Sequence, residues 1–449
     1  MIGKKVLTPE MISCLLKVRL AIWPTEVNRG SLMSLRVVST FSGISASSAA
    51  WMPLGFEMVG YCESAAFPAH VLHQRLGATA PKYLPDGPEF AVKRYAGING
   101  GRIVNFGDVT RITDDDLRAL GHVDLLEGGS PCQSFSVAGL RQGLADDRGN
   151  LALAFVDLAL RMRRINGLRF VVWENVTGVL SHAHNPFGCF LAALAGDRNP
   201  LVAPGNKWPN SGHLLVRGDE EAPEDPGQAT GGYVTIGWRV LDAQHFGVPQ
   251  RRRRVFAVAS FDPEVDAGQV LFEQQSEERH PATGRRPQQA GPGTSPANSG
   301  AVTALIGMDS DTMIRIEPKA AFALKASNHK NVQVVIHPRT VGTLCASGAG
   351  TARPGGQASE LDFVIVQGPM HSDEPGDFVC RRLTPLECER LQGFEDGWTD
   401  IAIDGKPVTD GHRYKALGNS IAVPCFAFIG ERLRSAVAAA KRKRWREAA

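Results

Sequence analysis

The sequence predicts an α/β fold with a doubly wound sheet, and the first half of the chain carries that prediction. Residues 37–39 form a short apolar strand that enters a turn, an Ala- and Ser-rich helix follows, and a second strand ends at Glu63. Residues 150–165 place apolar side chains at helical spacing, and an apolar strand follows at 169–173. Strands that alternate with helices in this way predict a largely parallel sheet with helices on both faces.

The remaining strands and the strand ends fill in this architecture. Residues 234–241 and 255–259 are rich in β-branched and aromatic residues and should extend the sheet. The turn at 41–46 follows the first strand, and Glu174 stands at the end of the strand that begins at residue 169. Ligands bind at the carboxyl ends of parallel strands, so these two places are candidate sites.

Three further segments depart from the α/β pattern. Residues 196–232 are rich in Gly, Pro, Asn and acidic residues without a clear period, which is typical of a surface insertion. Residues 261–379 combine a polar linker with short β-rich pieces and hold fourteen acidic against nine basic residues, so we expect a separate domain with few, specific contacts. Residues 380–449 return to the α/β domain, starting with a capping box at Thr384-Pro385-Leu386-Glu387.

Composition excludes several classes of protein. The formal charge is +3, so any nucleic-acid surface must come from local clustering. The eight cysteines contain no C-x-x-C pair, which argues against a zinc site or a disulfide framework, and we expect no metal. No run approaches a membrane span, so we expect a cytoplasmic protein without membrane contact. Residues 1–32 precede the pattern, Met33 is an alternative start, and we expect this head to be dispensable.

The loop Gly128 to Ser136, GGSPCQSFS, offers a candidate nucleophile. Cys132 directly follows a proline, after an apolar strand at 122–126 and two glycines that permit a sharp turn and a close approach to a ligand. A thiol reacts as its thiolate and needs an electropositive or polar setting. A buried structural cysteine is the alternative interpretation of the loop taken alone.

Eight separated blocks occur in a fixed order around this loop. They are Phe41-Ser42-Gly43, Glu63, Gly107-Asp108-Val109, Pro131-Cys132-Gln133, Glu174-Asn175-Val176, Gln250 with Arg252 and Arg254, Arg382-Leu383-Thr384-Pro385 and Gly418-Asn419-Ser420. With these blocks the sequence resembles the cytosine-5 DNA methyltransferases of bacterial or phage type, over roughly residues 36–260 and 380–430. The resemblance implies a Rossmann-like methyltransferase sheet with a smaller, β-rich target-recognition domain.

The resemblance implies S-adenosylmethionine as cofactor, with S-adenosylhomocysteine as product. Glycines are usual in the family where this chain has Ser45 and Ala46, and an acidic residue is usual at Ser39. A nicotinamide cofactor would require G-x-G-x-x-G, and the turn offers one glycine. The cofactor residues carried over are Phe41 and Val109 against the adenine, Asp108 on its amino group, Glu63 on the ribose, and Gly43, Ser45, Pro131, Asn419 and Ser420.

The resemblance also assigns catalytic roles. Cys132 would add to the base, while Glu174 and Arg254, with Arg252 beside it, would stabilise the charge that develops on the ring. Strand alternation puts Arg252 and Arg254 on one face, and a phosphate-binding or solvated basic run remains the alternative interpretation for Arg251 and Arg253. The glycine-containing segment 133–150 would close over flipped DNA, or serve as an ordinary linker. The expected DNA contacts are Gln133, Ser136, Arg141, Gln142, Gln250 and Thr343.

Two rival functions share these motifs. One is a tRNA cytosine-5 methyltransferase, which the large segment 261–379 argues against, since reading bases in a groove needs such a module. The other is a catalytically silent DNA-binding relative, which the presence of Cys132, Glu174 and Arg254 argues against. We expect double-stranded DNA as partner and a monomer, and the resemblance allows a cognate restriction endonuclease.

Overall fold

The computed structural model describes residues 34–130, 151–197, 199–217, 233–272 and 379–448, and the backbone of four short strands between residues 304 and 367. The strands β10 to β14 are described by their backbone alone. All statements below concern these parts of the chain.

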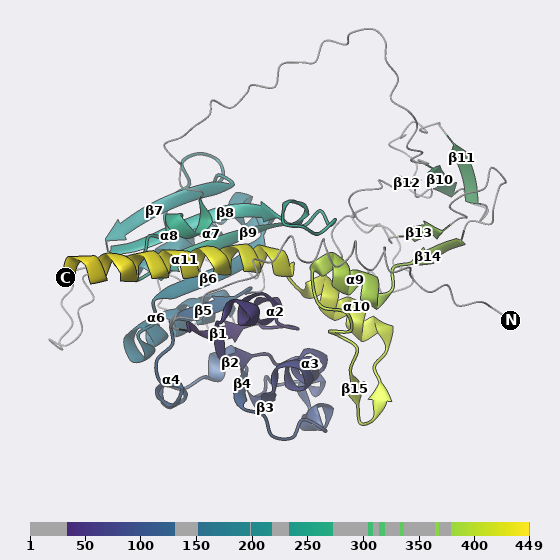
Figure 1. Cartoon of the computed structure of the whole chain (residues 1–449), viewed down its shortest axis with the longest axis horizontal. Coiled ribbons are helices and arrows are strands. Elements are labelled where there is room, and N and C mark those ends of the chain that lie inside the picture. The colour runs from purple at the N-terminus through teal and green to yellow at the C-terminus, as the bar shows by residue number, and fades with distance from the viewer. Residues whose placement is uncertain are drawn as a thin grey trace, which may run out of the picture. The chain divides into compact units, whose positions relative to one another are not determined.

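A nine-stranded sheet forms the centre of the α/β domain, in the order β3-β4-β2-β1-β5-β6-β9-β8-β7 (Figure 1). Neighbours from β3 through β6 pair in parallel, and β9, β8 and β7 continue the sheet in antiparallel pairs. The predicted α/β class with a mostly parallel sheet is therefore confirmed. The strands are β1 (Arg36–Thr40), β2 (Glu57–Cys62), β3 (Ala78–Tyr83), β4 (Ile103–Gly107), β5 (Leu125–Gly128), β6 (Phe170–Val176), β7 (Ser211–Arg217), β8 (Tyr233–Asp242) and β9 (Arg253–Ser260).

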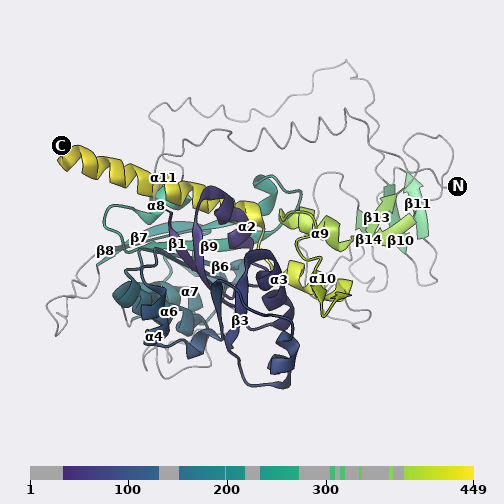
Figure 2. The same cartoon turned by 60° about the horizontal axis from the view of Figure 1, so that its bottom comes forward.

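Helices cover both faces of this sheet, which makes it doubly wound (Figure 2). A hydrophobic core lies on each face, and successive strand residues alternate between them: Leu125 packs into the first core and Leu126 into the second, both fully buried. The first core is covered by α2 (Ala46–Trp51), α3 (Ala66–Leu76), α8 (Ala267–Leu271) and α11 (Val423–Ala448). The second core is covered by α4 (Asp114–Leu120), α6 (Leu151–Asn166) and α7 (Pro186–Ala195). The 3-10 helices are η1 (Met52–Leu54), η2 (Pro88–Phe90), η3 (Val92–Tyr95), η4 (Val109–Arg111), η5 (Thr177–Ser181) and η6 (Ala243–His245).

The sheet edge corrects one sequence prediction. The segment 196–232, which we expected to be a surface insertion, contains β7, and β7 forms one edge of the main sheet. Its sequence, SGHLLVR, has three consecutive apolar residues and no two-residue alternation, so it lacks the pattern that predicts a half-buried strand. A Cβ at Gly212 would lie 2.1 Å from the Trp238 ring, so β7 can pair with β8 there only because residue 212 is glycine.

The α/β packing also extends beyond residue 260, where we expected it to end. Helix α8 packs on β8 and α11, and its side chains Val270 and Leu271 are fully buried. Trp51 and Trp398 connect the returning C-terminal segment to the first βαβ unit. The Trp51 indole donates to the carbonyl of Phe426 at 2.7 Å, and the Trp398 indole donates to that of Ile44 at 2.9 Å.

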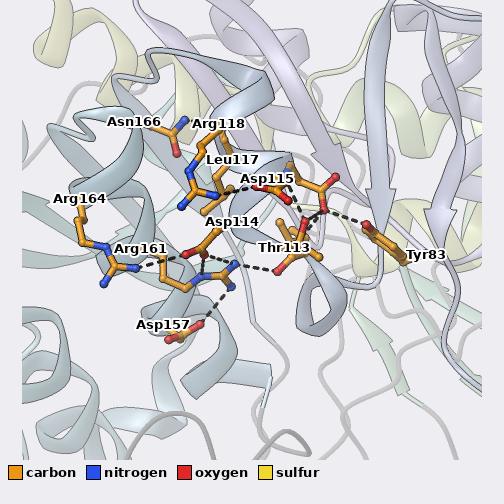
Figure 3. A network of polar contacts seen from close by, with 12 residues as sticks. Tyr83, Thr113, Asp114, Asp115, Leu117, Arg118, Asp157, Arg161, Arg164 and Asn166 are labelled. Carbon is orange, nitrogen blue, oxygen red and sulfur yellow. Dashed lines mark hydrogen bonds and ion pairs between the residues drawn. The ribbon is translucent and has the colours of Figure 1, made fainter.

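A polar network fixes α4 against α6 at the outer surface of the domain (Figure 3). Arg161 of α6 donates to Asp114, in the first turn of α4, at 2.8 Å and to the carbonyl of Ile112 at 2.9 Å. A capping box at Thr113 and Asp116 begins α4, and the Tyr83 hydroxyl joins it by donating to Asp116 at 2.9 Å. These contacts connect the second core to the β3 edge and carry no chemistry of their own.

The β-rich segment 261–379 contributes strands to two small sheets. One contains β10 (Ala304–Met308), β11 (Ile314–Pro318) and β12 (Gln333–Val335), and the other pairs β13 (Val364–Gln367) with β14 (Val379–Arg382). Helix α9 (Pro385–Gln392) then begins at Thr384 with the predicted capping box and with Pro at its first position, so that prediction is confirmed. The elements β15 (Ala402–Ile403), β16 (Lys406–Pro407) and α10 (Asp410–Asn419) lead to α11. Within the described residues, no helix has the length and apolar character needed to span a bilayer.

Candidate active site

The start of the cysteine loop is anchored beside Glu174. Ser130, the last described residue before the loop, accepts a hydrogen bond from the Trp173 indole at 2.9 Å, and its carbonyl accepts one from the Asn175 side chain at 3.0 Å. Both donors lie on β6 and flank Glu174, which stands near the carboxyl end of that strand as predicted. The sheet therefore brings the chain that leads into Cys132 next to the candidate acid.

Glu174, which is buried, and Arg254, which is partly buried, form an ion pair across β6 and β9. The Arg254 Nε lies 3.1 Å from Glu174 Oε1, and Glu174 is 8% exposed. Desolvation raises the pKa of Glu174, while the positive charges of Arg254 and then Arg252 oppose that rise. A Cβ at residue 129 would lie 2.9 Å from Glu174 Oε2, so glycine at this position lets the loop pass the carboxylate without displacing it.

The arginine run follows the predicted alternation. Arg251 and Arg253 are exposed, Arg252 is buried and Arg254 is partly buried. Arg252 donates to the carbonyls of Gly418 at 3.2 Å and Ser420 at 2.5 Å. It therefore connects the C-terminal block, Gly418-Asn419-Ser420, to the start of β9. Arg254 pairs with the candidate catalytic carboxylate of Glu174, and direct action of Arg252 on substrate stays a prediction.

Gln250 stands in an unusual environment for a predicted DNA contact. Its side chain is fully buried, and neither amide atom finds a hydrogen-bond partner within the described protein. An unsatisfied buried amide costs roughly 1–3 kcal/mol, so a partner that supplies those bonds would stabilise this site.

The cofactor turn is held by Glu63 at the end of β2. Glu63 Oε2 accepts from the Gly43 N–H at 2.7 Å, and Oε1 accepts from the Ala65 N–H at 2.6 Å. Desolvation raises the pKa of this carboxyl, against the lowering effect of those N–H groups. Each oxygen keeps a lone pair for a further donor. A Cβ at Gly43 would meet nothing within 4 Å, so space is open beside the turn, and the two acceptor oxygens of Glu63 suit a ligand that carries neighbouring hydroxyl groups.

The turn backbone is strained at two side-chain-bearing residues. Phe41 has φ 50° and Ser45 has φ 54°, a region that favours glycine. Ser45 is one of the places where the resembling family usually has glycine, and the φ value supplies the physical reason. Its hydroxyl compensates in part, because it caps α2 by accepting from the Ser48 N–H at 3.3 Å.

Two substitutions at Ser45 should therefore differ in stability. Both remove the hydroxyl that caps α2 and donates to the Ser48 hydroxyl at 2.6 Å, so both should lower the free energy of unfolding. Ser45→Gly also relieves a left-handed conformation worth about 1 kcal/mol, so its free energy of unfolding should exceed that of Ser45→Ala by about 1 kcal/mol. Urea unfolding at neutral pH checks both, and equal stabilities would contradict the strain argument.

Asp108 and Val109 directly follow the parallel strand β4, which ends at Gly107. Asp108 accepts from the Thr110 N–H at 2.9 Å and the Thr110 hydroxyl at 2.7 Å, and its Oδ2 lies 3.4 Å from Arg111 Nε. It therefore caps the following turn, while Val109 is buried in the second core. Their contacts with an adenine stay predictions. At the C-terminal block, Asn419 is exposed and Ser420 is buried.

Sequence reasoning missed two residues of this region. Trp398 supports the turn from the C-terminal segment through its bond to the Ile44 carbonyl, and an isolated tryptophan gives no local signal of that role. Glu127 is a buried carboxyl on β5, and its place in the apolar run Leu125-Leu126-Glu127 was a usable signal. The predicted site residues that lie outside the described chain are Pro131, Cys132, Gln133, Ser136, Arg141, Gln142 and Thr343.

Comparison with known proteins places these features in context. A family model described as C-5 cytosine-specific DNA methylase matches residues 35–195 and 229–435. A DNA N-6-adenine-methyltransferase of Escherichia phage P1 is 32% identical over 89% of this chain, which spans 61% of that protein's length. The type II methyltransferase M.NlaX of Neisseria lactamica is 26% identical over 78% of this chain and 87% of its own. The Dnmt2 methyltransferase of S. pombe matches with 14% identity and a TM-score of 0.47, over 90% of this chain and 99% of its own.

Proposed function

The chain belongs to the C-5 cytosine-specific DNA methylases, and from that premise we propose that it transfers a methyl group from S-adenosylmethionine to carbon 5 of a cytosine flipped out of duplex DNA. The observation that carries the proposal is the Glu174–Arg254 pair at the entrance of the cysteine loop. A carboxyl and a guanidinium held together here provide a proton and a positive charge for one enclosed base.

The chemistry explains why both groups are needed. Carbon 5 of cytosine is a weak nucleophile, so the thiolate of Cys132 first adds to carbon 6 and electron density moves to carbon 5. Negative charge then develops toward N3 and O2 of the ring. Glu174 protonates or shares a proton with N3, which its raised pKa favours, and Arg254 donates to O2. After methylation, loss of the carbon 5 proton and expulsion of the thiolate restore the aromatic ring.

The turn between β1 and α2 is the proposed cofactor site. Glu63, already fixed by the N–H groups of Gly43 and Ala65, would accept the ribose hydroxyls. Phe41 and Val109 would face the adenine, and Asn419 and Ser420 would close the site from the C-terminal block. When bound, the cofactor supplies an electrophilic methyl group.

The covalent step has a direct test. On cognate duplex DNA that carries 5-fluorocytosine, and with cofactor present, the protein should form an adduct that survives denaturation, because fluorine at carbon 5 blocks elimination. Cys132→Ser should form none, while Cys425→Ser, at a buried cysteine on α11, should behave as the parent protein. An adduct that persists in Cys132→Ser would place the nucleophile elsewhere.

The phage P1 relative is named as a DNA N-6-adenine-methyltransferase, which raises a second chemistry, methylation of adenine N6. Mass spectrometry of nucleosides from treated DNA separates the two, since our proposal requires 5-methylcytosine and no N6-methyladenine. RNA substrates belong in the same assay, because methylated tRNA in place of DNA would favour the RNA-directed alternative.

Sequence specificity is proposed to reside in residues 261–379, including Thr343. Because α8 packs on β8 and α11 of the α/β domain, the segment to be exchanged begins after residue 272. The α/β domain treats a flipped cytosine alike whatever its neighbours, whereas base edges in the groove differ in donors and acceptors. Grafting residues 273–379 onto a relative of known specificity should transfer this protein's target sequence, as bisulfite sequencing would record. An active chimaera that keeps its original target would contradict the assignment.

A further inference from the structure

Glu127 is a buried carboxyl that the proposed chemistry does not use. It lies on β5, between the strands that carry the cofactor turn and Glu174, and is 4% exposed. Its flanking residues Leu126 and Gly128 are buried as well, and an apolar side chain would suit the position. Its carboxylate accepts a hydrogen bond from the Ser47 hydroxyl of α2 at 2.8 Å.

A chain of hydroxyl groups continues from this bond beneath the cofactor turn. The Ser47 and Ser45 oxygens are 3.4 Å apart, and Ser45 donates to Ser48 at 2.6 Å. The Ser48 and Tyr61 hydroxyls then lie 2.9 Å apart, and every member of the chain is buried. The network thus runs from β5 through the first turn of α2 to β2, and Ser45, at positive φ, is in its middle.

The groups that face Glu127 come from each neighbouring element. Ser39 of β1 stands opposite it in register, Ser47 belongs to α2, Tyr61 to β2, and Glu174 approaches from β6. The pKa of Glu127 is raised to about 7, mainly by burial and also by the negative charge of Glu174, against the lowering effect of Ser39 and Ser47. An ionised carboxyl in this place opposes folding at neutral pH, so a role other than stability would account for it.

We propose that Glu127 is a positioning residue for the cofactor: through Ser47 it fixes the serine chain that holds Ser45, and with it the turn at residues 41–46, in the shape that binds S-adenosylmethionine. This inference rests on the proposed function, because it takes that turn as the cofactor site. An ionised Glu127 can only accept, so Ser47 must donate and its rotamer is fixed. A protonated Glu127 can donate to Ser47 instead, and the turn is then held less firmly.

The test is calorimetric binding of S-adenosylhomocysteine at pH 6 and pH 8 to four full-length proteins: the parent, Glu127→Gln, Ser47→Ala and, as matched control, Ser260→Ala. Ser260 is a buried hydroxyl on β9 that bonds to the Asp262 carbonyl, away from the turn. The parent and the control should bind about threefold or more tightly at pH 8 than at pH 6, by proton linkage at Glu127. Glu127→Gln should lose this pH dependence.

Ser47→Ala should weaken binding about fivefold at pH 8, the equivalent of one buried hydrogen bond. Its KM for the cofactor should rise accordingly, while kcat at saturating cofactor stays within about twofold, as expected for loss of ground-state binding. If both network variants bind as the parent does at both pH values, the inference is wrong. If the parent itself does not bind S-adenosylhomocysteine, the proposed function fails first. Should Glu127→Gln not fold, Ser47→Ala and its control still decide the question.

Discussion

Glu174→Gln is expected to lower methyl transfer by at least about 100-fold, the usual cost of losing a positioned acid. The amide keeps the size of the side chain and can still accept from Arg254 Nε, which lies 3.1 Å from the carboxylate. It cannot release a proton to N3 of the base. Single-turnover methylation of cognate DNA measures the loss, and DNA affinity, measured separately, should change little because the pocket shape is kept.

The control for this variant is Glu431→Gln, which removes an exposed carboxylate of α11 and should leave the rate unchanged. Activity of Glu174→Gln near that of the parent would show that the proton reaches the base from another group. A parallel loss of DNA binding and folded protein would indicate that the ion pair matters for structure and would leave its catalytic role without support.

Glu127→Gln is expected to stabilise the fold by roughly 3 kcal/mol at pH 8, from a pKa raised from 4.5 to about 7. The pKa of Glu127 is higher in the folded state, so the folded state holds the proton more tightly than the unfolded state. The free energy of unfolding of the parent therefore falls as pH rises from about 4.5 to about 7 and stays low at higher pH. Glutamine has no such charge, and its advantage should shrink to below about 1 kcal/mol at pH 5. Urea unfolding at the two pH values measures this.

Glu389→Gln provides a contrast of opposite sign. Glu389 is also fully buried, but it accepts from the N–H groups of Gly397 at 2.7 Å and Thr399 at 2.8 Å and from Arg413 at 3.1 Å. Removing its charge should lower stability by about 3 kcal/mol because Arg413 loses its buried partner. A Glu127→Gln variant that is also less stable than the parent at pH 8 would contradict the argument from desolvation.

Local patterns were sufficient for the features that depend on near neighbours in the chain. The capping box at Thr384 and the position of Glu174 at a strand end follow from spacing over a few residues, and the structure places both as expected. The alternation of Arg252 and Arg254 against their exposed neighbours follows from the period of two along an extended strand. The doubly wound sheet follows from the alternation of strands with helices.

Tertiary structure alone decided the contacts between segments that are distant in the chain. Arg252 bonds to Ser420, 168 positions away, and Glu127 bonds to Ser47, 80 positions away. The pairing of β7 with β8 depends on the fit of Gly212 over Trp238. The sequence determined which elements form and which side chains stand at their ends, because propensity and periodicity act over a few residues. Which of those side chains meet depends on how the whole sheet assembles, and no local pattern encodes that.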